Sequence, residues 1–247
     1  MNRREFLTAV PALAFLAAEG TSVALGDDPA SGPAFSPAEG METIKLLKPE
    51  ADGGKSVLAA LWARKTSRRI SEKKLPAQVL SNLLWAAWGV NRQAGPFRQV
   101  GRTAASASNS QEIDLYVVLA EGVYLYEAAG HRLALVLAGD HRAKVSRRRR
   151  RRSRATAPVI LIYVADIARY AKARFQEPGL KDPEIQKSYS SVATGLIAGN
   201  VYLFAASQGL AAWFHNCNKA ALAAALKLRP EQRVLYAHTV GYPADDD

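Results

Sequence analysis

A six-residue segment, Arg64-Lys65-Thr66-Ser67-Arg68-Arg69, gathers four cations and two hydroxyl groups. Arginine forms forked, charge-assisted hydrogen bonds, lysine supplies a point charge, and threonine or serine adds a neutral donor. This combination suits the binding of a phosphate group. The alternative is a basic turn between two helices that is only solvated.

A second segment, Arg102 to Gln111 (RTAASASNSQ), is rich in small and amide-bearing residues and leads into the strand-like sequence IDLYVV. Small residues such as Ser106 and Ala107 let a flat ring approach the backbone. The amides of Asn109 and Gln111 can both donate and accept, as the edge of a pyrimidine-like ring requires. The alternative is an ordinary serine-rich loop before a strand.

A third segment, Gly209 to Cys217 (GLAAWFHNC), is an apolar strand that ends in polar groups. Taken together and in this order, the three segments resemble the nitroreductase family of FMN-dependent oxidoreductases. The likeness is greatest to its branch of SagB-type dehydrogenases, which oxidise azolines. The resemblance spans residues 55 to 243 and is more specific than any one of its parts.

The resemblance implies FMN as the cofactor and assigns ten residues to its site. Those matching the family's phosphate motif are Arg64, Lys65, Thr66 and Arg68. Those matching its Pro-Ser-Ala-x-Asn-x-Gln segment along the isoalloxazine are Ser106, Ala107, Asn109 and Gln111, with Ala105 in place of Pro. In the family, a Pro-Ile-Glu-Gly segment places its last backbone N–H near flavin N5, and Asn216 and Cys217 replace the Glu and Gly of that segment. The resemblance does not supply a catalytic acid or base, for which Tyr189 and His215 are the candidates.

Two departures from the family pattern bear on the cofactor. The chain ends in Asp245-Asp246-Asp247, where other members have a basic pair that grips the phosphate, so we expect weaker FMN binding. Asn216 and Cys217 alter the surroundings of N5, although a backbone N–H can donate whatever its side chain.

Hydrophobic periodicity predicts the elements that would position these segments, in an α+β fold. The predicted helices are 56–64, 76–88, 190–208 and 219–227, and the predicted strands are 113–120, 122–127, 158–165, 210–215 and 234–241. The resemblance implies a central mixed or antiparallel sheet flanked by helices, and a homodimer with FMN at its two-fold interface. Helix 190–208 is apolar on nearly all sides, and Gly195, Ala198 and Gly199 would allow close packing there.

Composition restricts the class of protein further. Cys217 is the single cysteine, which excludes an internal disulfide, and the four histidines show no ligand spacing, so we expect no metal. Arg147–Arg152 and Arg154 supply most of the net charge of +11, so the rest of the chain is nearly neutral. This arginine run predicts either a solvated surface loop or contact with anionic lipid headgroups. Nucleic acid is not an expected partner.

The N-terminus has the layout of an export signal. Arg3 and Arg4 precede Phe6-Leu7 and a short apolar run, and this pattern resembles the twin-arginine signal, which exports folded proteins. The alternative is an ordinary secretory signal. We assign residues 1–26 to the signal, 27–40 to a flexible linker and 41–247 to the FMN-binding domain. Because FMN is made in the cytoplasm, a flavoprotein that acts in the periplasm would have to cross the membrane folded, carried by the twin-arginine machinery.

The sequence thus predicts an exported, FMN-dependent oxidoreductase that transfers a hydride between flavin N5 and a small organic substrate. The alternative is a non-catalytic protein on the same scaffold, which binds flavin or uses Arg147–Arg152 to bind an anionic surface.

Replacing Arg3 and Arg4 with lysines tests the export route. The change keeps the positive charge but removes the pair that a twin-arginine receptor reads. We expect the variant to stay in the cytoplasm as folded, FMN-loaded protein, because both residues precede the folded domain. Cell fractionation and intact mass would show this, and export as efficient as that of the parent would exclude the twin-arginine route.

Overall fold

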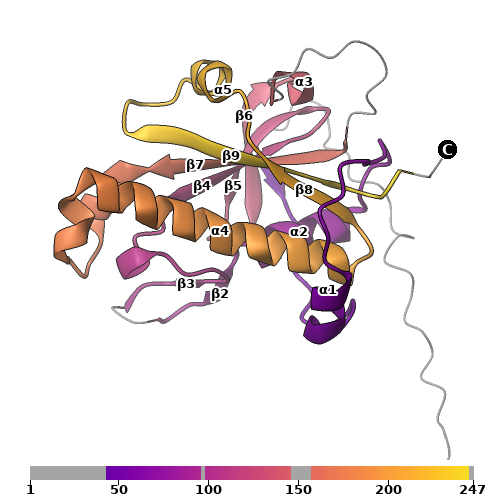
Figure 1. Cartoon of the computed structure of the whole chain (residues 1–247), viewed down its shortest axis with the longest axis horizontal. Coiled ribbons are helices and arrows are strands. Elements are labelled where there is room, and N and C mark those ends of the chain that lie inside the picture. The colour runs from indigo at the N-terminus through magenta and orange to yellow at the C-terminus, as the bar shows by residue number, and fades with distance from the viewer. Residues whose placement is uncertain (1–42, 96–97, 146–156, 245–247) are drawn as a thin grey trace, which may run out of the picture.

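An antiparallel sheet of seven strands, in the order β1-β6-β5-β4-β7-β9-β8, organises the chain (Figure 1). The computed structural model describes residues 43–95, 98–145 and 157–244. The strands are β1 (Thr43–Lys45), β4 (Ile113–Val118), β5 (Gly122–Glu127), β6 (Arg132–Ala138), β7 (Val159–Asp166), β8 (Ala211–His215) and β9 (Gln232–Gly241). Two short strands, β2 (Val90–Arg92) and β3 (Gly101–Arg102), pair separately.

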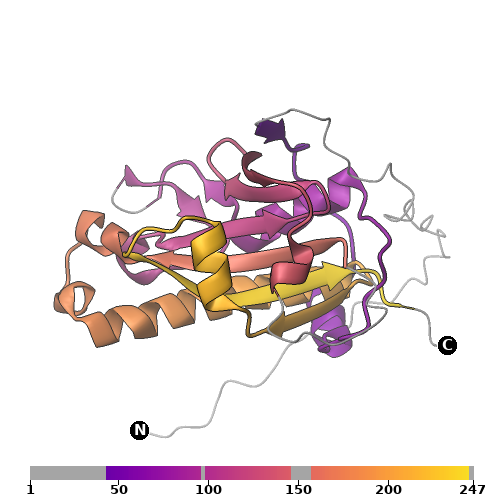
Figure 2. The ribbon, with the colours of Figure 1, turned by 90° about the horizontal axis from the view of Figure 1, so that it is seen from above.

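Helices cover both faces of the sheet, as Figures 1 and 2 show. The α-helices are α1 (Val57–Ala63), α2 (Ala77–Trp88), α3 (Arg142–Val145), α4 (Pro183–Ser207) and α5 (Lys219–Ala225). The 3₁₀ helices are η3 (Ala107–Asn109), η4 (Ile167–Lys172) and η5 (Pro178–Lys181). Helices α2 and α4 lie on one face of the sheet and α3 and α5 on the other.

The central strands are apolar on both faces, because each face packs against helices. In β7, Leu161 and Tyr163 face the core beneath α2 and α4, whereas Ile162 and Val164 face the core beneath α5. Successive side chains of a strand point to opposite faces, so one continuous apolar run fills two cores.

Helix α4 crosses one face of the sheet and buries one side of itself there. Its inner residues Ala193, Ile197, Val201 and Ala205 are at most 1% exposed. The helix is long and apolar enough to span a membrane by length and composition, but this packing is that of a core helix. Its outer side carries Val192 and Leu196, which are 58% and 46% exposed.

The α+β fold predicted from the sequence, with an antiparallel sheet flanked by helices, is confirmed. The sequence predicts the long helix from Ser190, whereas α4 begins at Pro183, because Asp182 caps it by accepting from the backbone N–H groups of Glu184 and Ile185. Ala198 is buried in the core beneath α4 and is not available to a partner helix. The sequence does not predict strands β1, β2, β3 and β6; β6 (RLALVLA) is rich in leucine and alanine, which favour helices.

Several expectations lie outside the described residues. These are the export signal, the linker up to residue 40, the arginine run Arg147–Arg152 with Arg154, and the acidic C-terminus.

His238 is fully buried in β9, where it packs among the rings of Tyr163, Tyr202 and Phe214. Its Nδ1 lies 3.1 Å from the hydroxyl of Tyr163, and its Nε2 has no partner among the described residues. Burial, and to a smaller extent the neighbouring His215, lowers the pKa of His238 to about 3. The imidazole is therefore neutral in the folded protein.

This burial predicts a loss of stability in mild acid. Between pH 6.5 and 3 the unfolded chain binds a proton at residue 238 that the folded chain does not, so the free energy of unfolding falls as the pH falls. From pH 7 to pH 5 this group should cost about 2 kcal/mol. His238→Leu, although less stable at pH 7, should lose less stability over that interval in urea denaturation. Parallel pH dependences of the parent and the variant would contradict the assignment.

Candidate functional site

The basic turn (residues 64–69) runs from the end of α1 to β8, where the Ser67 N–H donates to the Ala212 carbonyl over 2.9 Å. It borders a cleft of about 700 Å³, named here the basic-turn cleft. Among the residues that line this cleft are four cations, which make it positively charged, and two small residues, which leave it open. The cations are Lys55, Lys65, Arg68 and Arg69, and the small residues are Gly209 and Ala211. No Asp or Glu is among the described residues that line it. Its donor set therefore fits a phosphate group, and its small residues leave room for a bulky ligand.

Tyr202, on α4, holds the basic turn against β8. Its hydroxyl accepts the Phe214 N–H over 2.9 Å and lies 3.0 Å from the Thr66 hydroxyl. Since the hydroxyl accepts one bond, its own proton is free to be donated to Thr66. The Arg64 guanidinium lies 5.5 Å from the centre of the Tyr202 ring, within the range of a cation–π contact. Arg64 and Thr66 thus contact Tyr202, whereas Lys65 and Arg68 line the cleft.

The end of β8 carries a connected set of polar groups. His215 Nδ1 lies 2.8 Å from the Asn216 carbonyl, which can only accept, so Nδ1 carries the proton and Nε2 accepts from the Thr239 hydroxyl. The Cys217 N–H donates to Asn216 Oδ1 over 3.0 Å. This is the N–H expected to approach flavin N5, and here the Asn216 side chain accepts it. The Cys217 side chain is fully buried in the core on the α5 face.

The small-residue loop (residues 103–111) uses its polar side chains to hold its own shape. Ser106 Oγ accepts the Gln111 N–H, and the Gln111 amide donates to the Val100 carbonyl and to Asn109 Oδ1. Asn109 Nδ2 also bonds the Val100 carbonyl. The amides expected to face the edge of a ring are thus engaged within the protein, and Ala107 packs beside Tyr170 and Leu180.

The same loop is strained. Ser108, Asn109 and Gln111 have φ of 48°, 52° and 51°, in the left-handed region that non-glycine residues adopt at a cost of about 1–3 kcal/mol each. Strain of this kind persists only where surrounding bonds maintain it, and it is frequent at ligand sites. The bonds within the loop supply that constraint.

The basic turn and the small-residue loop lie on opposite flanks of α4. Asn200 Nδ2 donates to the Thr103 carbonyl at the start of the loop, whereas Tyr202 holds Thr66 of the turn. Two residues of a helix advance about 200° around its axis, so these anchors point to different sides. Within one chain, the two groups of residues expected to bind one cofactor line separate clefts.

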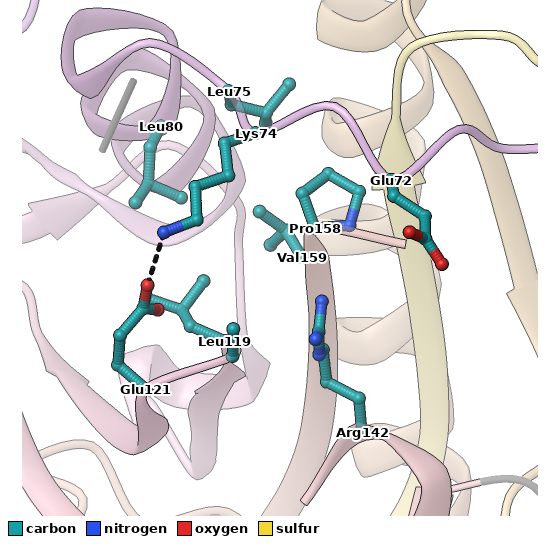
Figure 3. Close-up of a pocket in the computed structure, with 10 residues that line it drawn as sticks. Glu72, Lys74, Leu75, Leu80, Leu119, Glu121, Arg142, Pro158 and Val159 are labelled. Carbon is teal, nitrogen blue, oxygen red and sulfur yellow. Dashed lines mark hydrogen bonds and ion pairs between the residues drawn. The ribbon is translucent and has the colours of Figure 1, made fainter. Parts of the chain in front are cut away.

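A smaller cavity of about 220 Å³ lies between the start of α2 and the β4–β5 turn (Figure 3). Lys74 Nζ donates to Glu121 over 2.6 Å, and Leu75, Leu80 and Leu119 line the cavity beside this pair. None of the residues predicted to bind FMN lines this cavity.

The two candidate catalytic residues lie on different elements. Tyr189 is on the first half of α4, beside Tyr170, and a hydrogen bond to Glu177 raises the pKa of Tyr189. His215 stacks on Trp213, with 4.3 Å between ring centres. Within the described ranges, no group of three or more His, Cys, Asp or Glu residues could hold a metal ion.

Comparison with known proteins connects this geometry to a family. The nitroreductase family model matches residues 61–242. A crystal structure of a protein named as a nitroreductase, from Ralstonia eutropha JMP134, has 32% sequence identity and a TM-score of 0.73, covering 87% of this chain and 95% of that one. A protein of Methanocaldococcus jannaschii, also named as a nitroreductase, is 28% identical over 177 residues, which are 68% of this chain and 82% of the relative.

A chain of the Escherichia coli microcin synthetase McbBCD complex, solved with truncated pro-MccB17 bound, is also similar. It has a TM-score of 0.61 and 14% identity, with coverage of 92% of this chain and 85% of that chain. At this identity the likeness concerns the fold alone.

The Tyr202 hydroxyl gives a prediction about phosphate binding. Tyr202→Phe removes the bond that links Thr66 to β8 but keeps the ring beneath Arg64. We expect the affinity for FMN to fall about fivefold, while that for riboflavin, which lacks the phosphate, stays unchanged. Titration monitored by flavin fluorescence measures both, with Tyr124→Phe on β5, which lines neither of the two large clefts, as the control. An equal loss for both flavins would mean that Tyr202 acts on the fold and not on the phosphate.

Proposed function

This chain belongs to the nitroreductase family, and we propose that it is an FMN-dependent oxidoreductase acting on a small organic substrate outside the cytoplasm. Members of the family are generally FMN-dependent oxidoreductases. The FMN site and the substrate of this chain are our inference from its own residues.

The observation that carries the proposal is the basic-turn cleft. Four cations line it without a carboxylate among the described lining residues, and Gly209, Ala205 and Ala211 leave space beside them. The arginines offer forked donors and the lysines offer point charges to a phosphate, and the small side chains leave room for a flat ring system.

In this proposal, Lys65 and Arg68 bind the phosphate, and Arg64 and Thr66, held by Tyr202, fix the shape of the turn. When bound, FMN supplies the hydride chemistry, and the protein supplies position and electrostatics. The Cys217 N–H becomes available to a ligand only if the Asn216 side chain rotates away from it. Asn216 therefore controls access to that donor.

We propose that the complete site needs a second copy of the chain. Family members are often homodimers, and this chain exposes a large apolar surface on two helices in contact, α1 and α4. On α1, Val57, Leu58, Leu61 and Trp62 are between 51% and 92% exposed. On α4, Gly195 and Gly199 have no atom within 4 Å of where a Cβ would lie, so another helix can approach closely. Sedimentation as a monomer at micromolar concentration would contradict this.

We also propose that the protein is exported with its cofactor already bound. Support comes from Arg3-Arg4 followed by Phe6-Leu7, together with a cofactor that is made in the cytoplasm. The proposal implies that the electron donor need not be free NAD(P)H.

Denaturing the purified protein tests the cofactor. We expect release of FMN and not FAD, because the basic turn provides one phosphate site and the chain has no Gly-rich dinucleotide motif. Arg68→Ala should remove a charge-assisted phosphate contact worth about 1.5–3 kcal/mol, whereas Arg64→Ala should act through the shape of the turn, and we expect each change to weaken FMN retention at least tenfold. Arg132→Ala, an exposed arginine of β6, is the control.

Chromatography and mass spectrometry of the released material identify the flavin. Release of FAD, or of no flavin at all, would contradict the proposal and favour the non-catalytic alternative. Unchanged FMN content in both arginine variants would place the phosphate elsewhere.

A further inference from the structure

A second large cleft, named here the loop cleft, opens beside the small-residue loop. It has a volume of about 710 Å³, within the range of small-molecule sites. It lies between β3, η4 and the segment that precedes β9, and four cations line it: Arg102, Arg169, Lys172 and Arg229.

Two of these cations are neutralised by neighbouring carboxylates. Arg169 donates to Asp114 and lies 3.5 Å from Asp166, and Arg229 donates to Asp166 over 2.7 Å. Arg169 also donates to the Gln111 carbonyl over 2.7 Å, which ties the cleft to the small-residue loop. These two arginines are therefore structural, with Asp114 and Asp166 as their counter-ions.

The other two cations form no ion pair with a carboxylate among the described residues, although Asp114, which pairs with Arg169, also acts on Arg102 at longer range. Arg102 is half-buried, and its Nε and Nη1 donate to Gln111 Oε1 and the Trp88 carbonyl, which leaves Nη2 without a partner in the described part of the chain. Lys172 is exposed at the end of η4 and makes no hydrogen bond or ion pair with a described residue. The Glu112 carboxyl, just after the loop, is fully buried, and burial raises its pKa, which favours its neutral form.

A half-buried guanidinium that forms no ion pair of its own is costly unless an anion binds to it. Arg102 is held in place by two hydrogen bonds and by the Trp88 ring, 5.2 Å away. Its free nitrogen is thus fixed before any ligand arrives. Lys172, a flexible point charge on the same cleft, can close on an anion from the solvent side.

We propose that the loop cleft binds the anionic group, a carboxylate or a phosphate, of a small molecule, with Arg102 as the fixed donor and Lys172 as the mobile one. The assignment rests on the proposed function only in identifying that molecule as the substrate. The cleft shares Asn109 and Gln111 with the loop expected beside the flavin ring, so an anion bound there lies next to the proposed reaction site. The substrate is accordingly an anionic molecule, recognised by its charge.

Calorimetric titration of the purified protein with benzoate and with its neutral analogue benzamide tests the assignment. We expect benzoate to bind at least tenfold more tightly than benzamide. Lys172→Gln should weaken benzoate binding about fivefold and leave benzamide binding unchanged. Lys172→Arg keeps the charge and should restore the affinity. Lys181→Gln, an exposed lysine of η5 outside the cleft, should match the parent.

Equal affinity for benzoate and benzamide, or an unchanged benzoate affinity in Lys172→Gln, would overturn the proposal. The FMN content of the same preparations separates the other outcomes. Loss of FMN but not of riboflavin binding in Lys172→Gln would mean that the cleft holds the cofactor's phosphate, which also overturns it. If protein that contains no flavin still prefers benzoate, and this preference depends on Lys172, the anion site would be supported. The proposed FMN-dependent function would then be contradicted instead.

Discussion

The burial of one side of α4 against the sheet fixes the arrangement of the whole site. Ile197 and Val201 are fully buried there, and each such side chain contributes about 1.5–3 kcal/mol, so the helix cannot rotate about its axis without losing this contact. Once the rotation is fixed, Asn200 must face the small-residue loop and Tyr202 the basic turn. The outer side, with Gly195 and Gly199, is left for a partner. The division of the site between two flanks is therefore a consequence of core packing.

Most of the polar side chains near the site form hydrogen bonds that hold the backbone in place. Gln111 and Asn109 maintain a loop with left-handed residues, Asn216 accepts an N–H, and Tyr202 joins a turn to a strand. Such bonds contribute about 1 kcal/mol each, which is modest, but they define positions to which a ligand can be fitted without rearrangement. Charge is supplied separately, by the cations that line the two clefts.

The sequence predicts the fold well because strong periodicity marks the central strands and α2, whose boundaries agree with the structure to within two residues. The prediction is wrong at the start of α4, because the residues after Asp182-Pro183 are mostly polar and show no apolar periodicity. The N-cap Asp182 and the N1 proline Pro183 were the available signal for the helix start. Tyr202 could not be found from the sequence, since its partner Thr66 is 136 residues away. The apolar spacing of α1 correctly predicts a helix, but it does not reveal that Trp62 is 92% exposed. Periodicity shows that a helix has an apolar face, but not what packs against that face.

The FMN content of a mixed dimer tests most directly whether the site is shared between two copies. One chain would carry Arg64→Ala and Arg68→Ala, and the other Ala105→Trp, which fills space beside the loop from an exposed position. Each homodimer should hold little FMN. In the purified heterodimer, a shared site joins the intact basic turn of one chain to the intact loop of the other, so we expect one FMN per two chains. If each site lay within a single chain, both would be damaged, and a heterodimer as poor in FMN as the homodimers would contradict the account.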